Sequence, residues 1–161
     1  MAKNCRVITV TPDLAADSVA ATVPYADKDV IGNLLTLSNA VLNTKGVGKL
    51  DSLVVRSKIA TALIMDIFFL NEAPAAAFGD NNSAYALSDD DLSKVIGVVH
   101  VAAAEWNDSN TLNYVAQKSN LEMNLQALAG QKDLYMIVIA RGAITFVAAG
   151  DMEIDVAFEQ D

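Results

Sequence analysis

The residues that could do chemistry are few and scattered along this 161-residue chain. His100 is the one histidine, and it stands in the apolar run VIGVVHV. A metal site built from several imidazoles is therefore excluded. On a strand His100 would alternate with Val99 and Val101, so the pattern predicts a hydrogen-bonded or partly exposed histidine in preference to a ligand or a general base.

The densest group of oxygen-bearing side chains is the stretch GDNNSAYALSDDD, whose acidic residues run from Asp80 to Asp91. It departs from the calcium loop of EF-hands, because the glycine of the sixth position and the glutamate of the twelfth are missing. We interpret it as a loop that leads into a short helix, with Ser88 as N-cap and the aspartates after it beside the positive end of the helix dipole. Calcium is the alternative.

The usual nucleophiles and phosphate cradles do not appear in the sequence. No serine lies in a G-x-S-x-G elbow, and TKGVGKLDS at 44–52 lacks the spacing of a phosphate-binding glycine loop. Cys5 is the single cysteine, and with only Arg6 as a nearby cation we predict a small buried residue, not a reactive thiol. The sequence assigns no catalytic, cofactor-binding or metal-binding residue, so we expect that the protein is not an enzyme. A small hydrolase is kept as an alternative, because a catalytic pair cannot be singled out among twenty acidic residues.

Three aromatic residues in the second half of the chain raise the question of carbohydrate binding. Trp106, Tyr114 and Tyr135 could form a platform for a sugar ring only if the rings were exposed. We predict instead that they lie in the core or in a subunit contact. A carbohydrate-binding module is the alternative function.

Composition and charge narrow the choice of partners. The residues are 53% hydrophobic and 19% charged, which is typical of a globular protein. A net charge of −9 disfavours phosphate backbones and anionic lipids, so we expect neither nucleic acid nor a membrane as partner. The longest apolar run, at 59–70, contains Asp66 and is too short to span a bilayer.

The elements that must position any site are predicted to be strands, because apolar residues recur with a period of two. The closing segment alternates most sharply, and Gly97 marks a bulge or a close backbone approach. We expect an all-β fold, a β-sandwich or jelly roll with eight to nine strands and at most one short helix, formed as a single domain by residues 1–161. The predicted strands lie at 3–10, 32–42, 49–57, 61–70, 95–106, 120–128, 134–142, 143–150 and 151–161.

The core is predicted from two of these strands. Their inward-facing residues are Leu63, Met65, Ile67 and Phe69 in the first, and Met152, Ile154, Val156 and Phe158 in the second. The closing strand would carry Asp151, Glu153, Asp155 and Glu159 on its other face. We expect these carboxylates to keep that strand from pairing edge to edge with another chain.

Four stretches resemble the head decoration, or capsid cement, proteins of tailed bacteriophages and their jelly-roll relatives. They are VPYADKDVIGNLLTL, GKLDSLVVRSK, LIMDIFFLNEAPAAAFGDNNSAYALSDDDLSKVIGVV and LYMIVIARGAITFVAAGDMEIDV. The shared features are an Asn-Glu-x-Pro turn after an apolar strand, an aspartate-rich turn before an Ile-Gly-Val strand, and an Arg-Gly hairpin. The resemblance implies a jelly roll or β-sandwich with no active site.

The resemblance also implies a function and a place. A decoration protein would bind the outer surface of a capsid and stabilise it as a non-enzymatic virion component, with the major capsid protein as partner. It would be made in the host cytoplasm and end on the virion exterior. We expect a homo-oligomer, because a rather apolar chain of this length leaves apolar area to be covered by subunit contacts. The resemblance favours a trimer, since such proteins often sit on three-fold or quasi-three-fold axes of the capsid and cyclic symmetry closes the assembly.

Overall fold

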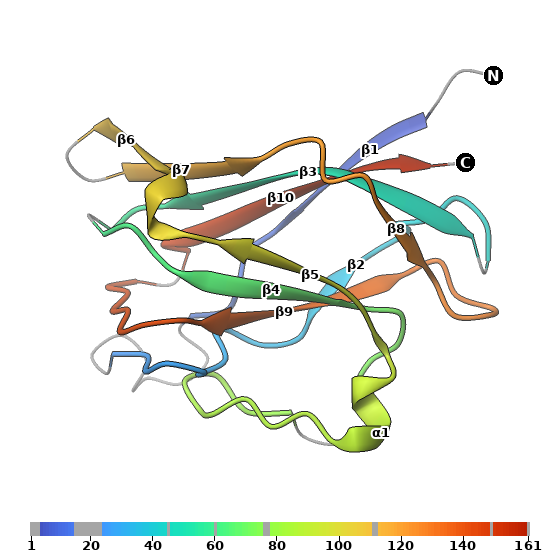
Figure 1. Cartoon of the computed structure of the whole chain (residues 1–161), viewed down its shortest axis with the longest axis horizontal. Coiled ribbons are helices and arrows are strands. Elements are labelled where there is room, and N and C mark those ends of the chain that lie inside the picture. Colours follow the sequence, from blue (N-terminus) through green and yellow to red (C-terminus); the bar gives the residue numbers. More distant parts are fainter. Residues whose placement is uncertain are drawn as a thin grey trace.

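The computed structural model describes residues 4–14, 24–44, 46–59, 61–75, 78–110, 113–148 and 150–160, which form a sandwich of two antiparallel sheets (Figure 1). The larger sheet has six strands, in the order β1 (Asn4–Val10), β10 (Met152–Gln160), β3 (Val47–Ser57), β7 (Asn113–Lys118) and β6 (Trp106–Asn110), with β8 (Met123–Gln126) also paired to β3. The smaller sheet has the order β2 (Leu35–Leu37), β9 (Leu134–Ala140), β4 (Met65–Leu70) and β5 (Val95–Val101). The all-β prediction is confirmed, with ten strands in the described residues.

Helix is confined to two short pieces of the described chain. The four-residue α1 (Asp89–Leu92) begins at Ser88, whose hydroxyl accepts a hydrogen bond from the amide of Asp91, as the sequence predicts. One 3₁₀ turn, η1 (Ala103–Glu105), connects β5 to β6. No helix in the described part of the chain is long and apolar enough to cross a membrane.

The core lies between the sheets and matches the predicted residues. All eight are buried, with exposed fractions of 1% or less: Leu63, Met65, Ile67, Phe69, Met152, Ile154, Val156 and Phe158. They belong to one cluster that also contains the inner residues of β3 and β9. Each large apolar side chain removed from water in this way contributes about 1.5–3 kcal/mol, so this cluster supplies the main stabilisation of the sandwich.

Several predicted strands are wrong or too long. The strand predicted at 95–106 ends at Val101, because the 3₁₀ turn Ala103–Glu105 follows it. The described residues of 143–150 form no strand, and Ile144 makes only an isolated bridge to Tyr25. The cause is local, because the carboxylate of Asp151 accepts hydrogen bonds from the amides of Val147 and Ala148 and closes a turn. The strand predicted at 32–42 shrinks to Leu35–Leu37, since Asn39 has a φ of 53° that ends the extended backbone.

One hairpin was not predicted at all. Strands β6 and β7 pair as neighbours at the end of the six-stranded sheet. Their sequences, WNDSN and NYVAQK, lack a regular apolar alternation. Tertiary pairing with β3 and the burial of Trp106 and Ala116 compensate for the weak local pattern.

The closing strand has a different place from the one expected. Strand β10 lies between β1 and β3 and is therefore not an edge, so its carboxylates cannot protect an edge. Two of them pair across the sheet instead: Arg56 contacts Glu153 at 3.0 Å and Asp155 at 2.6 Å. The prediction for Cys5 is also wrong, because β1 is the edge strand and leaves this thiol exposed.

Gly97 fulfils the prediction of a close approach. A Cβ atom at this position would lie 2.3 Å from the sulfur of Met123 on β8, so a side chain here would force that of Met123 to move. The register between β4 and β5 also shifts at Phe69/Leu70, next to this glycine. Gly97 therefore lies where β5 of the smaller sheet comes close to β8 of the larger one.

Candidate functional site

The outer face of β9, β4 and β5 collects the polar groups that sequence analysis left unconnected. His100 on β5 and Asp66 on β4 are directly opposite each other. The His100 Nδ1 atom lies 2.6 Å from one oxygen of Asp66, and the Nε atom of Arg141 donates to the other oxygen at 2.6 Å. We call this surface, with His100, Asp66, Arg141, Phe68 and Val98, the His100 face.

Electrostatics at the His100 face favour the ionised carboxylate. Burial alone would raise the pKa of Asp66, but hydrogen bonds from His100 and Arg141 and their charges outweigh it and lower the pKa. The side chain of Asp66 is 16% exposed, whereas that of His100 is 56% exposed. The aspartate is thus a fixed anchor, and the imidazole presents its other edge to solvent.

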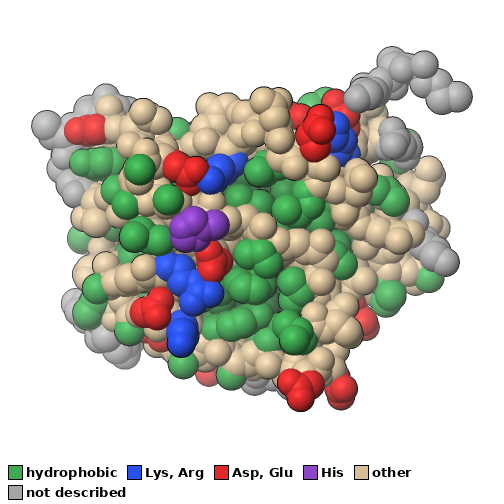
Figure 2. All heavy atoms as spheres, in the orientation of Figure 1, with side chains coloured by type: hydrophobic (Ala, Val, Ile, Leu, Met, Phe, Trp, Pro, Cys, Tyr) green, Lys and Arg blue, Asp and Glu red, His purple; other side chains and the backbone are tan. Residues whose placement is uncertain are grey.

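A second apolar cluster lies beneath the same face. Its buried members come from β4, β9 and the segment before β2, namely Leu70, Ile137, Ile139 and Val30. Half-buried side chains continue it toward the surface, among them Phe68 and Tyr85, whose rings lie 5.4 Å apart. Val98 is 42% exposed, and Figure 2 shows hydrophobic side chains gathered beside the histidine with acidic and basic groups close by.

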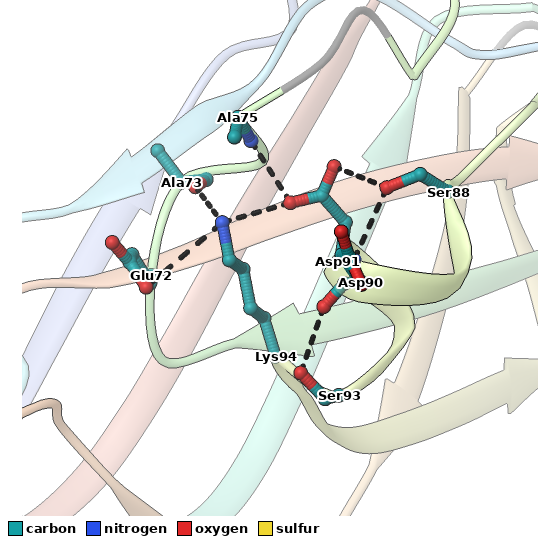
Figure 3. Close-up of polar contacts among 8 residues, drawn as sticks. All are labelled: Glu72, Ala73, Ala75, Ser88, Asp90, Asp91, Ser93 and Lys94. Carbon is teal, nitrogen blue, oxygen red and sulfur yellow. Dashed lines mark hydrogen bonds and ion pairs between the residues drawn. The ribbon is translucent and has the colours of Figure 1, made fainter.

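The segment between β4 and β5 covers part of this apolar cluster, and Asp91 fastens it (Figure 3). The buried carboxylate of Asp91 accepts hydrogen bonds from the amide of Ala75 at 2.9 Å and the hydroxyl of Ser88 at 2.8 Å. It also forms an ion pair with Lys94 at 2.8 Å. Lys94 in turn donates to the carbonyl of Ala73, so both ends of the covering segment are tied to one carboxylate.

Asn81 fastens the middle of the covering segment. Its buried side-chain oxygen accepts hydrogen bonds from the hydroxyl of Tyr25 at 2.6 Å and the amide of Gly32 at 2.8 Å. The backbone of Val30 exchanges hydrogen bonds with Ser83 and Asn82. The stretch considered as a calcium site therefore holds the covering segment against the sandwich. Its most buried carboxylate, that of Asp91, is bound to partners within the protein.

The described residues of that stretch are not arranged as a metal site. Within the residues that the structure describes, no group of three or more histidine, cysteine, aspartate or glutamate side chains is placed to hold a metal ion. Asp89 and Asp90 are exposed in the first turn of α1, where they lie beside the positive end of the helix.

The aromatic residues do not form an exposed platform. All ten phenylalanine, tyrosine and tryptophan residues lie in the described ranges, and each is buried or half-buried. Trp106 is 8% exposed, and its indole nitrogen donates to the carbonyl of Leu63 at 2.6 Å. Tyr114 packs against the main core and Tyr135 against the second cluster, so the core placement predicted for these three rings is confirmed.

The outer face of the six-stranded sheet is of another kind. Its central strands carry Arg56, Glu153 and Asp155 in ion pairs, and Thr9 donates to Asp155 at 2.7 Å. The hydrogen bond from Arg56 is the main reason why the pKa of Asp155 is lowered. The charged groups at the centre of this face are paired with one another. The His100 face is therefore the candidate docking surface.

Sequence analysis found His100 and missed its partners. It placed His100 between two buried valines, and Val99 and Val101 are indeed 4% and 0% exposed. Asp66 and Arg141 could have been noticed, since each is the one charged residue within or directly after an otherwise apolar strand. Their proximity follows only from the pairing of β4 with β5 and β9, which a single sequence does not give.

Comparisons with known proteins assign the chain to no family, and the class that its fold defines is an antiparallel β-sandwich. No protein-family model matches the sequence, and no curated relative does either. Among solved structures, the chain is similar to one from the full particle of Israeli acute paralysis virus heated to 63 degrees. The two share 9% identity and a TM-score of 0.30 over 98% of this chain and 71% of that chain, a likeness too low to carry an argument.

Proposed function

We propose that this protein is a non-enzymatic virion component that decorates a bacteriophage capsid from outside, binding the major capsid protein as a homo-oligomer. The observation that carries the proposal is the resemblance of four sequence stretches to capsid cement proteins. The fold agrees with what that resemblance implies, because the described chain is a β-sandwich with one short capped helix.

The resembling stretches contribute to both sheets. In the smaller sheet they include β2, β4, β9 and residues 95–99 of β5, together with the covering segment between β4 and β5. In the larger sheet they include nearly all of β3 and the first half of β10. Strands β1, β6, β7 and β8 lie outside them. The resembling stretches therefore contain most of the His100 face, namely Asp66, Phe68, Val98 and Arg141, and His100 itself follows the third stretch directly.

The chemistry of the His100 face suits a protein partner. Val98 and Phe68 offer apolar contact, while the Asp66 carboxylate holds the side chains of His100 and Arg141 in place. Apolar contact beside fixed polar groups is typical of protein interfaces, where the apolar part gives affinity and the polar part gives register. We infer that this face meets the capsid protein, with the charged outer face of the other sheet turned to solvent.

The polar cluster on this face is better explained by positioning than by catalysis. Asp66 and His100 form the orienting half of a catalytic triad, and a triad also needs a nucleophile within hydrogen-bond reach of the imidazole. In the described residues the hydrogen bond of His100 is with Asp66, and Asp66 is shared with Arg141. The arrangement fixes two side chains at a surface.

Capsids that lack the protein provide the test. Purified protein is mixed with such capsids, and the particles are pelleted and imaged; the proposal predicts stoichiometric binding and ordered density on the outer surface. A trimer is the oligomer we favour, since cyclic symmetry closes without a free sticky surface. A protein that stays monomeric at micromolar concentration and leaves the capsids bare would refute both parts of the proposal.

A further inference from the structure

Strand β1 is the least protected sheet edge in the described part of the molecule. The other four edges carry features that discourage pairing. Strands β2 and β8 have only three and four residues, β6 contains Asp108 and a register shift, and β5 has a register shift and packs against β8 at Gly97. Strand β1 has seven residues, pairs with β10 without a shift, and contains one charge, Arg6.

The side chains of β1 are also only partly buried. Val7 is 59% exposed on the outer face. On the inner face Ile8 and Val10 pack against the main cluster but stay half-buried, unlike their neighbours Val156 and Ile154 on β10. A further strand beside β1 would complete the burial of Ile8 and Val10.

We propose that β1 pairs with β1 of a second copy, antiparallel across a two-fold axis, and joins the two six-stranded sheets into one. Such a contact is self-complementary, as a two-fold interface requires. It rests on the edge geometry alone and not on the capsid proposal, because β1 lies outside the stretches that resemble cement proteins.

The sequence of β1 selects one register. Inner residues must stay inner across the new pair, so even-numbered residues pair with even and odd with odd. Centring the axis on Arg6 would place two arginines opposite each other, and centring it on Ile8 would leave the first residues of β1 unpaired. Centring it on Val7 pairs all seven residues, with Val7 against Val7 and Cys5 against Thr9 of the second copy.

The negative charge of the two copies does not prevent this contact. The carboxylates nearest to the new pair are on β10, where Asp155 is opposite Thr9 and Glu159 is opposite Cys5. Carboxylates of the two copies would be three strand spacings apart, about 14 Å. That separation exceeds the Debye length of about 8 Å at physiological ionic strength, so the repulsion is largely screened and the association should strengthen with salt.

Disulfide trapping tests the register. In the variant Val7→Cys/Cys5→Ser the two thiols would face each other at a Cα separation of about 5 Å, within the range of a disulfide. We expect a covalent dimer under mild oxidation. The unaltered Cys5 residues would be about 14 Å apart and should not join. The matched control is Val147→Cys/Cys5→Ser, since Val147 is 75% exposed and lies in a loop that takes no part in the proposed strand pair.

Mass measurement tests the contact without cross-linking. Sedimentation should give an even multiple of 17.1 kDa, a dimer from the β1 contact alone or a hexamer if two trimers are joined by it. Val7→Lys should halve the mass, because it puts two lysines opposite each other. Val147→Lys should leave the mass unchanged, and equal melting temperatures would show that both variants fold. A mass that Val7→Lys does not change, or equal trapping by the Val147 control, would overturn the inference. Capsid binding is measured separately, so either proposal can fail alone.

Discussion

The outer faces of the two sheets differ although their inner faces are alike. Both inner faces are packed with apolar residues of one core. The outer face of the six-stranded sheet carries ion pairs around Arg56, whereas that of the four-stranded sheet carries a second apolar cluster beneath a fastened segment. Where that segment covers it, the smaller sheet is therefore apolar on both sides, as expected of a sheet that is covered twice.

This difference explains why the strands look unlike one another in the sequence. The run LYMIVIA of β9 has buried residues on both faces, and MEIDVAFEQ of β10 alternates because only one face is covered. A continuous apolar run thus marks the sheet whose outer face meets other parts of the molecule, and a sharp alternation marks the sheet that faces solvent.

The largest expected effect is in the shared core. Phe69→Ala removes a ring that is 0% exposed between the sheets, and it should lower the free energy of unfolding by about 3–5 kcal/mol. Urea denaturation followed by far-ultraviolet circular dichroism measures the change. A loss below about 1 kcal/mol would mean that the inner face of β4 is not core.

The next substitution compares the outer faces directly. Ile137→Ala alters the outer face of the four-stranded sheet, where the side chain is fully buried, and should cost about 2–5 kcal/mol. Val54→Ala alters the outer face of the six-stranded sheet, where the side chain is half-buried, and should cost less than about 1 kcal/mol. Equal costs in the same denaturation assay would remove the distinction between the two faces.

Loss of the Asp91 contacts that fasten the covering segment should have a smaller effect on stability. Asp91→Asn removes the buried charge that pairs with Lys94, and it should cost about 2 kcal/mol, as for hydrogen bonds to charged groups. Its exposed neighbour Asp90 offers a matched control, because Asp90→Asn leaves the side-chain contacts of Asp91 intact. If hydrogen exchange at 71–94 rises equally in both variants, Asp91 does not fasten the segment.

The smallest effect concerns pH at the His100 face. The pKa of Asp66 is lower in the folded chain than in the unfolded one, so its contribution is fully present above the ordinary carboxyl pKa of about 4 and is lost as pH falls through the lowered pKa. Asp66→Asn should therefore lose less stability than the unaltered protein between pH 5 and 2. Parallel curves of melting temperature against pH would contradict this assignment.

Much of the fold could be predicted, because period and burial agree wherever a strand faces the core. The eight core residues, the cap at Ser88 and the close approach at Gly97 follow from residue type and spacing. The hairpin of β6 and β7 could not be predicted, since pairing with β3 holds it together. The edge position of β1 and the meeting of Asp66 with Arg141 depend on strand order, which local pattern does not encode.

Binding to capsids by variants of the two outer faces tests the central claim most directly. Val98→Lys places a charge on the His100 face, and Val54→Lys places the same charge on the other outer face. Copies bound per capsid are counted after co-sedimentation with particles that lack the protein. We predict that the unaltered protein and Val54→Lys bind to the same level and that Val98→Lys binds at least tenfold more weakly. Absence of binding by the unaltered protein, or equal binding by both variants, would contradict the account.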